Sequence, residues 1–172
     1  MSESSFNDHT VYIGLGSNLA EPNEQILSAI DAINAINNCQ ITSVSALYGS
    51  KPMGPQDQPD YVNAVLALTT SLAPLALLDE LQQIEQASGR VRKEERWGPR
   101  TLDLDIILFG EQQINNQRLT VPHYGMKVRE FVLLPLLEIA PELILPDGDK
   151  LSALCNNIDH NGLTKLATIN AS

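Results

Sequence analysis

The sequence has few cationic and few aromatic residues, and both shortages restrict what the protein can bind. It contains 11 Lys and Arg against 21 Asp and Glu, so its formal net charge is −10. Aromatic residues make up only 5% of the chain. Because Lys and Arg contacts to phosphates dominate nucleic-acid affinity, this composition disfavours a general role in nucleic-acid binding.

Cysteines, apolar runs and leader patterns are also scarce. The two cysteines, Cys39 and Cys155, have no metal-like spacing, and we interpret them as reduced thiols. The N-terminus, MSESSFNDHT, is polar without a signal-peptide pattern, and no apolar stretch approaches the length that spans a bilayer. We therefore expect a soluble cytoplasmic protein without a membrane partner, with residues 1–10 as a flexible tail.

The basic residues that are present lie close together in the sequence. Eight of the 11 Lys and Arg fall between Arg90 and Arg129. A locally cationic site in an acidic protein suits a small, highly charged ligand that is chelated with metal. The length of 172 residues fits one domain with a sizeable core, and we predict a single domain over residues 1–172.

The segment Arg90–Gly110, RVRKEERWGPRTLDLDIILFG, joins a basic stretch to an apolar run that carries two acids. Successive side chains of a strand point to opposite faces, so Asp103 and Asp105 should share one face. Their Cα atoms would lie roughly 6.5 Å apart, close enough for the carboxylates to hold one cation or a close pair. The upstream arginines favour polyanions such as phosphates. This combination is typical of phosphoryl transfer.

Taken singly, these motifs have plainer interpretations. A D-x-D pair is common and could mark a strand edge with salt-bridged acids, and a basic segment is usually a solvated loop. The G-x-G of Gly14 and Gly16 lacks the third glycine of a dinucleotide fingerprint, so it argues little for a Rossmann site. No P-loop motif occurs, so any nucleotide must be held in another way.

Hydrophobic periodicity predicts the element order β-α-β-β-α-β. The predicted strands are 11–16, 41–48, 61–70 and the acid-bearing run before Gly110. The predicted helices are Pro22–Ile36 and a second one with Ser71 as its N-cap that stops at Gly89. This order is the split βαβ or ferredoxin-like pattern, an α+β sandwich with a mainly antiparallel sheet and both helices on one face.

The C-terminal third adds a hairpin and short helices to this core. Gln112 to Val121 is expected to form the hairpin, and Arg129 to Ile139 an apolar helix interrupted by Pro135. Leu151 to Asn156 is expected to form a short terminal helix. A lone histidine such as His123 is more often structural or merely exposed than functional. Its place in this basic third shifts the balance modestly toward a functional role.

Asn63 lies on the apolar run Tyr61–Thr70, where a buried amide needs partners. It either ties down the neighbouring loop Gly49–Asp60 or reads the edge of a ligand, and the pattern alone leaves both open.

Two kinds of binding domain are alternatives to an enzyme. An RNA-recognition domain shares the strand order but should be basic with exposed aromatics. A metabolite-sensing ferredoxin-like domain does not need the paired acids.

Four ordered motifs together resemble one family. The run R-W-G-P-R-T-L-D-L-D-I-I resembles the signature of the 6-hydroxymethyl-7,8-dihydropterin pyrophosphokinases of folate biosynthesis. The similarity extends to G-L-G-S-N-L, G-P-Q-D-Q-P-D-Y-V-N-A and L-T-V-P-H-Y. It covers about Val11 to Asp147, most of the chain. Four ordered motifs of this length are far more specific than a D-x-D pair.

The resemblance implies transfer of pyrophosphate from ATP to the hydroxymethyl group of the pterin, with release of AMP. It implies that Asp103 and Asp105 hold two Mg²⁺ ions, which agrees with two-metal phosphoryl chemistry. From the net charge we expect no nucleic-acid partner, and we expect a monomer. The loops Gly49–Asp60 and Arg90–Arg100 would act as lids that exclude water.

The resemblance also assigns the other site residues. The arginines expected to contact phosphates or order the closing loop are Arg90, Arg92 and Arg100. The residues expected around the nucleotide are Gln82, Glu85, Ile106, Arg118, Thr120, His123, Tyr124 and Arg129. The residues expected around the pterin are Ser50, Pro52, Met53, Tyr61, Asn63, Trp97 and Phe131. An aromatic sandwich suits the flat pterin ring, and Asn63 suits its polar edge.

Overall fold

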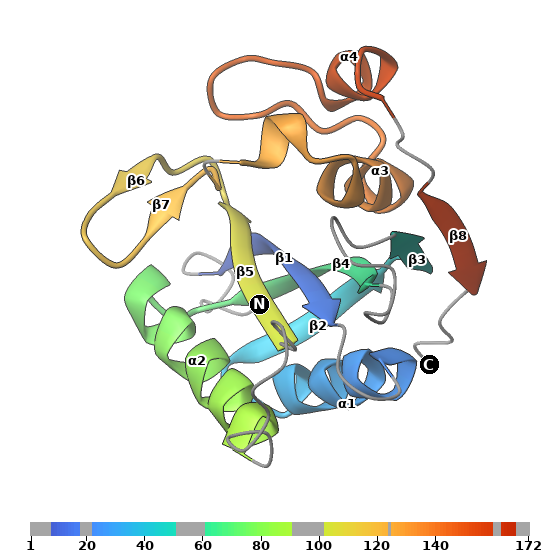
Figure 1. Cartoon of the computed structure of the whole chain (residues 1–172). Helices are drawn as coiled ribbons and strands as arrows, with labels where there is room; N and C mark the ends of the chain where they lie inside the picture. The colour runs from blue at the N-terminus through green and yellow to red at the C-terminus, as the bar shows by residue number, and fades with distance from the viewer. Residues whose placement is uncertain are drawn as a thin grey trace.

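Within the described residues (8–17, 22–50, 61–90, 102–123, 125–159 and 163–167), six strands of the computed structural model form one antiparallel sheet (Figure 1). The strand order is β5-β1-β4-β3-β8, and β2 also pairs with β4. The strands are β1 His9–Ser17, β2 Cys39–Val44, β3 Leu47–Ser50, β4 Tyr61–Thr70, β5 Leu102–Phe109 and β8 Thr164–Ala167. A separate hairpin is formed by β6 Ile114–Asn115 and β7 Thr120–Val121.

Helices cover both faces of this sheet (Figure 1). They are α1 Pro22–Asn34, α2 Pro74–Arg90, α3 Glu130–Ile139, α4 Leu151–Asn156 and the 3-10 turn η2 Met126–Val128. The helices α1 and α2 pack on one face against the buried Ile13, Leu66 and Leu104. On the other face α3 and α4 pack against Val65 and Ile107. The predicted mixed fold with a mainly antiparallel sheet is therefore confirmed.

The expected strand 41–48 is broken into β2 and β3. The break contains Ser45, which is fully buried. Its hydroxyl accepts the backbone N–H of Val65 at 2.9 Å, and its own N–H donates to the Val65 carbonyl at 2.8 Å. The side chain thus replaces part of the regular ladder, an exchange that serine makes readily. Periodicity predicts both halves but does not reveal this local substitution.

The predicted helix boundaries need correction at both helices. The first helix ends at Asn34 instead of Ile36, and Asn38 follows with a positive φ of 72°. The second helix begins at Pro74, so Ser71 is not its N-cap. The N–H of Ser71 instead donates to the Asn38 carbonyl, which continues the β2–β4 pairing one residue beyond Cys39 and Thr70. Proline suits the first helical position because that position needs no N–H partner.

The C-terminal third follows the prediction with two differences. The hairpin and α4 form as expected, and α3 runs through Pro135 without interruption. Its buried Leu133 and Leu136 flank the proline and anchor the helix on the second core, so packing outweighs the lost N–H. The strand β8 was not predicted, and it pairs with β3.

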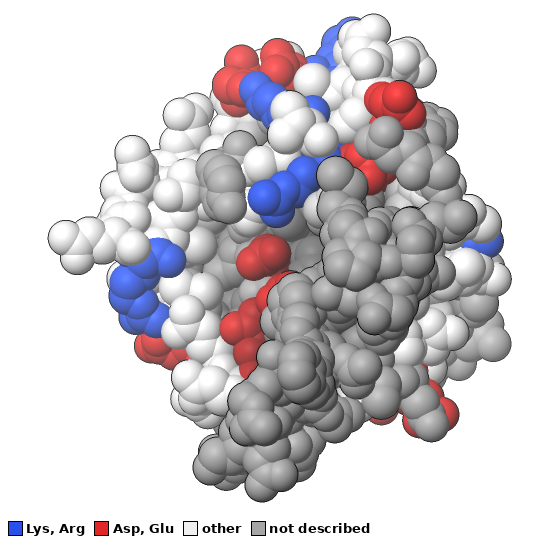
Figure 2. All heavy atoms as spheres, viewed as in Figure 1, with Lys and Arg blue, Asp and Glu red and all other residues white. Residues whose placement is uncertain are grey.

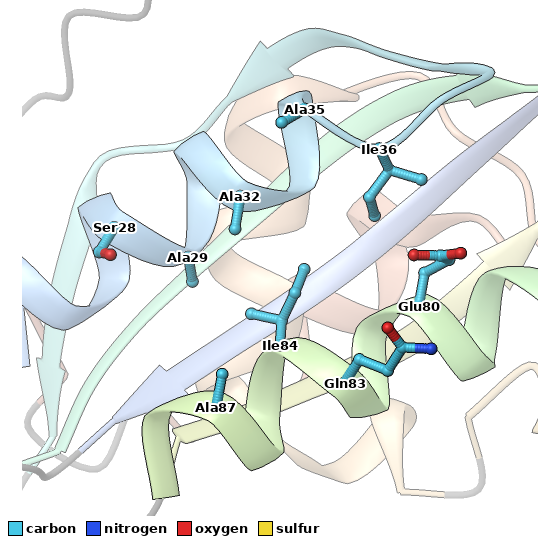
Figure 3. Close-up of a pocket in the computed structure, with 9 residues that line it drawn as sticks. All are labelled: Ser28, Ala29, Ala32, Ala35, Ile36, Glu80, Gln83, Ile84 and Ala87. Carbon is cyan, nitrogen blue, oxygen red and sulfur yellow. The ribbon is translucent and has the colours of Figure 1, made fainter. Parts of the chain in front are cut away.

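The helices α1 and α2 leave a groove of about 500 Å³ between them (Figure 3). Its lining comes from Ser28, Ala29, Ala32, Ala35, Ile36, Glu80, Gln83, Ile84 and Ala87. This groove lies on the α1–α2 side of the sheet, opposite the acid-bearing face. Both cysteines are free thiols, as predicted. Among the described residues, no helix is long and apolar enough to cross a membrane.

Candidate active site

Strand pairing brings an acid, a glycine, an amide and a phenol into one row across the sheet. Asp103 pairs with Gly16, Gly16 pairs with Asn63, and Asn63 pairs with Tyr48. Directly paired residues of neighbouring strands present their side chains on the same face. The row therefore lies on one face, the face that α3 covers in part. A second row runs parallel to it, through Asp105, Gly14 and Val65.

The two acids of β5 lie as their spacing predicts. Asp103 and Asp105 are exposed, whereas Leu102, Leu104 and Ile106 are buried against α1 and α2. Figure 2 shows acidic side chains bordering a hollow near the middle of the face, with basic atoms beside them. The strand thus carries its carboxylates out of the core, where hard cations and water can reach them.

Glycines keep the sheet surface open between the acids and the amide. A Cβ added to Gly16 would lie 3.0 Å from Oδ1 of Asn63, and one added to Gly14 would lie 3.1 Å from Cδ1 of Ile107. Asn63 is itself buried, at 5% exposure. In the sequence these glycines resemble only an incomplete dinucleotide-binding motif. The signal that was missed is their spacing of two, which places both on one face of a strand.

Glu85 of α2 holds the edge of the acid-bearing strand. Its Oε2 accepts the backbone N–H of Leu104 at 2.7 Å. Leu104 stands between the two aspartates on β5, which forms one edge of the sheet. Burial raises the pKa of Glu85 from 4.5 to about 7; the Leu104 N–H opposes this shift, and the nearby Asp103 and Asp105 add to it. Glu85 therefore carries a proton over much of the range below neutrality.

Glu85→Gln is expected to flatten the dependence of stability on pH between about 4.5 and 7. In this window the native Glu85 keeps a proton that the unfolded chain has lost, so the free energy of unfolding falls as pH rises. Glutamine cannot titrate and can still accept the Leu104 N–H. Urea unfolding at several pH values across the window measures the difference. Parallel stability profiles for both proteins would contradict the prediction.

His123 faces Asp105 from the segment that follows β7. Its backbone N–H donates to the Ile107 carbonyl at 3.0 Å, and its Nδ1 accepts the N–H of Gly125 at 3.1 Å. In the neutral ring the hydrogen is therefore on Nε2, which lies 4.0 Å from Oδ2 of Asp105. Burial lowers the pKa of His123; Asp105 opposes this and Arg129 adds to it. The ring presents a neutral N–H donor beside the acids.

A cavity of about 300 Å³ lies where β5, α2 and the β6–β7 hairpin meet. The predicted nucleotide residues that line it are Gln82, Glu85, Ile106, Arg118, Thr120 and His123. Arg118 Nη2 donates to Asp79 Oδ1 at 2.6 Å and to Gln82 Oε1 at 3.2 Å, which joins the hairpin to α2 at the rim. Arg129 is not in this lining, and Tyr124 lies outside the described residues.

The predicted pterin-binding residues that the structure describes lie on β3, β4 and α3. Asn63 lies in the row with Asp103, and Phe131 lies half-buried in the first turn of α3. The guanidinium carbon of Arg129 is 5.9 Å from the centroid of the Phe131 ring. Ser50 pairs with Tyr61 through the backbone, which joins the ends of β3 and β4. The pairing of β3 with β4 therefore brings Ser50, Tyr61 and Asn63 to one end of the sheet.

Several predictions fall on parts of the chain that the structure does not describe. The predicted site residues outside the described residues are Pro52, Met53, Arg92, Trp97, Arg100 and Tyr124. The side chains of Ser50, Tyr61 and Arg90 are not described either. The predicted lids, Gly49–Asp60 and Arg90–Arg100, also lie almost wholly outside. Their contacts and movements stay predictions.

The donor set fits a hard divalent cation. Asp103 and Asp105 offer exposed carboxylate oxygens on one face, the ligand type that Mg²⁺ prefers. Over the described part of the chain, no group of three or more His, Cys, Asp or Glu is placed to hold a metal. Mg²⁺ usually binds through one or two carboxylates, with water and substrate phosphates completing its octahedron. Two carboxylates beside an open cavity match that requirement.

Comparison with known proteins agrees with these features. Residues 12–141 match the family model described as 7,8-dihydro-6-hydroxymethylpterin-pyrophosphokinase. Among curated proteins, the chain is 54% identical over 157 residues to a Haemophilus influenzae protein, covering 91% of this chain and 98% of that one. It is 56% identical over 156 residues to a Pseudomonas aeruginosa protein, covering 91% and 96%. Both are named 2-amino-4-hydroxy-6-hydroxymethyldihydropteridine pyrophosphokinase.

Solved structures share the fold at low sequence identity. A Plasmodium falciparum HPPK-DHPS structure with pteroate gives a TM-score of 0.67 at 14% identity. An HPPK-DHPS structure in complex with substrates gives 0.68 at 15% identity. These matches cover 87% and 86% of this chain, which spans only 42% and 43% of the longer chains. They therefore support the fold of the matched part alone.

Proposed function

The chain belongs to the 7,8-dihydro-6-hydroxymethylpterin-pyrophosphokinase family, and from this premise we propose that ATP is its donor and AMP its released product. Its activity is that of a pyrophosphokinase in folate biosynthesis. In the proposed reaction the hydroxymethyl oxygen of the pterin bonds to the β-phosphorus of ATP. The bond from that phosphorus to the α,β-bridging oxygen breaks, AMP leaves with that oxygen, and the hydroxyl proton passes to water.

Asp103 and Asp105 are the proposed ligands of two Mg²⁺ ions. The observation that supports this most directly is the row from Asp103 through Gly16 to Asn63. Gly16 has no side chain, so the sheet surface between the acid and the amide is open. Bound there, Mg²⁺ would neutralise phosphate charge and make the substrate hydroxyl more acidic. The strand supplies two carboxylates at a fixed spacing, and Glu85 restrains the backbone between them.

The cavity between β5, α2 and the hairpin is the proposed nucleotide site. Asp105 is part of its lining, so phosphates bound there would meet the acid-bearing strand. The neutral His123 offers an N–H donor on this side, and Arg118 offers a guanidinium at the rim. Arg90, Arg92 and Arg100 are proposed to balance the remaining phosphate charge.

The pterin is proposed to bind at the other end of the row. Asn63 would pair with the polar edge of the ring, and Phe131 would stack on one of its faces, with Tyr61 or Trp97 opposite. The open sheet surface at Gly16 would let the hydroxymethyl group approach the metal-bound phosphates. Asn63 as a reader of the ligand is thus favoured over its role as a loop anchor.

Catalysis is proposed to rest on positioning and charge neutralisation instead of a side-chain base. Glu85 is occupied by the Leu104 N–H, and Asp103 and Asp105 are assigned to metal. Orientation of two bound substrates can supply a large part of the rate.

We also propose that the core is a ferredoxin-like domain, with β2 and β3 as halves of its second strand, and that it acts as a single-domain monomer.

The product formed from MgATP and 6-hydroxymethyl-7,8-dihydropterin tests the proposal. AMP in equal amount to consumed pterin is the expected result, measured by ion-exchange chromatography. ADP would indicate transfer of a single phosphoryl group and would contradict the proposed bond cleavage. Unchanged ATP would favour a metabolite-sensing role. Omitting the pterin is the control, because AMP formation should require the hydroxymethyl acceptor.

A further inference from the structure

Glu138, near the end of α3, ties this helix to the sheet through three contacts. Its Oε1 accepts the N–H of Ala46 at 3.1 Å and the hydroxyl of Tyr48 at 2.7 Å. Its Oε2 lies 3.8 Å from Nζ of Lys165 on β8. The carboxylate of Glu138 thus links α3 to β3, to β8 and to the junction between β2 and β3. None of these residues was assigned a functional role by the motifs.

The contacts of Glu138 fall where the sheet lacks regular pairing. The β2–β4 ladder ends at Val44, and the β3–β4 ladder has Tyr48 as its outermost recorded pair on that side. Ala46 lies in the break between them, so its N–H requires an acceptor from outside the ladder. The Tyr48 ring is buried, at 9% exposure, and burial together with the acceptor carboxylate of Glu138 raises its phenol pKa. The neutral phenol therefore stays a donor to Glu138.

The contacts of Glu138 affect the candidate pterin site through the β3–β4 pair and through α3. Tyr48 pairs directly with Asn63, and β3 ends at Ser50. On α3, Phe131 precedes Glu138 by seven residues, so both lie on similar sides of the helix, about 10 Å apart along its axis. The anchor at Glu138 therefore fixes the spacing between the helix that carries Phe131 and β3, the strand whose Tyr48 pairs with Asn63.

We propose that Glu138 is a positioning residue for the pterin, acting through Ala46 and Tyr48 to set the gap between α3 and the β3–β4 pair. The role rests on the proposed function, since it presumes that the pterin lies between Phe131 and Asn63. Glu138 does not touch the substrate in this role. A well-set gap gives a flat ring contacts on both of its faces at low ordering cost.

The test compares steady-state constants of Glu138→Ala, Glu138→Gln and wild type, well below their melting temperatures. Glu138→Ala is expected to raise KM for the pterin about tenfold, with kcat and KM for ATP within about twofold. Glu138→Gln should restore the wild-type KM, because its amide oxygen can accept both hydrogen bonds. Fluorescence titration of the pterin with a non-hydrolysable ATP analogue present should show the same order of affinities.

Two further variants keep the test decisive. Lys165→Met removes only the exposed ion pair, and it should change KM for the pterin less than about twofold. Tyr48→Phe keeps the ring volume and loses one hydrogen bond, so a rise of about threefold is expected even if Glu138→Ala fails to fold. Equal rises in both KM values, or an unchanged pterin KM in Tyr48→Phe and Glu138→Ala, would overturn the positioning role. Absence of AMP with wild type would instead refute the proposed function.

Discussion

Asp105→Ala is expected to lower kcat by about a thousandfold or more, the largest effect of any single change considered for this chain. Asp105 is exposed on β5, and it contributes no apolar contact to either core, so the fold should survive the substitution. The loss would come from removing one of two carboxylates that hold metal at the phosphates. AMP formation at saturating substrates, measured over a range of Mg²⁺ concentrations, gives the effect.

Glu111→Ala is the matched control for Asp105→Ala. Glu111 is also an exposed carboxylate, and it lies just beyond the end of the same strand. Its removal changes the net charge by the same amount but leaves the acid-bearing face intact, so turnover within about twofold of wild type is expected. Near-normal turnover of Asp105→Ala would contradict the two-metal proposal, because the remaining aspartate alone offers too few ligands for a close pair of ions.

The acid-bearing strand is predictable from sequence because its signal is local. Strand alternation alone places Asp103 and Asp105 opposite Leu102 and Leu104, and the burial of these residues confirms that placement. The same holds for Tyr61–Thr70, whose predicted bounds coincide with β4. In both cases a run of one periodicity is bounded by turn residues, and no distant contact has to be known.

The rest of the site depends on contacts between residues far apart in the chain. The break at Ser45 is made by a hydroxyl that pairs with Val65, and the anchor at Glu138 reaches Tyr48 across 90 positions. Neither contact leaves a periodic trace. The strand β8 is short, and it follows irregular sequence, so only its pairing with β3 defines it. Such features require the tertiary register, which propensity does not supply.

Gly16→Ala is expected to lower kcat/KM for the pterin about a hundredfold, through displacement of a buried hydrogen-bonding side chain. The new methyl group would lie 3.0 Å from Oδ1 of Asn63, closer than side-chain carbons ordinarily approach. Asn63 is held by neighbouring strands on both sides, so it must turn its amide away from the ligand or shift the sheet. Steady-state kinetics with pterin as the varied substrate, at a temperature where the variant is folded, measures the loss.

Gly14→Ala separates this effect from a general intolerance of side chains on β1. It adds the same methyl group to the same face, two residues away, but its nearest neighbour is Cδ1 of Ile107 at 3.1 Å. That atom belongs to a buried hydrocarbon side chain and not to the Asp103–Asn63 row, so relief of the close contact leaves the proposed ligand contacts in place, and kcat/KM within about threefold of wild type is expected. Equal losses in both variants would show that β1 is sensitive to added volume anywhere on this face. A loss in Gly16→Ala alone would locate the sensitivity between Asp103 and Asn63, where the two substrates are proposed to meet.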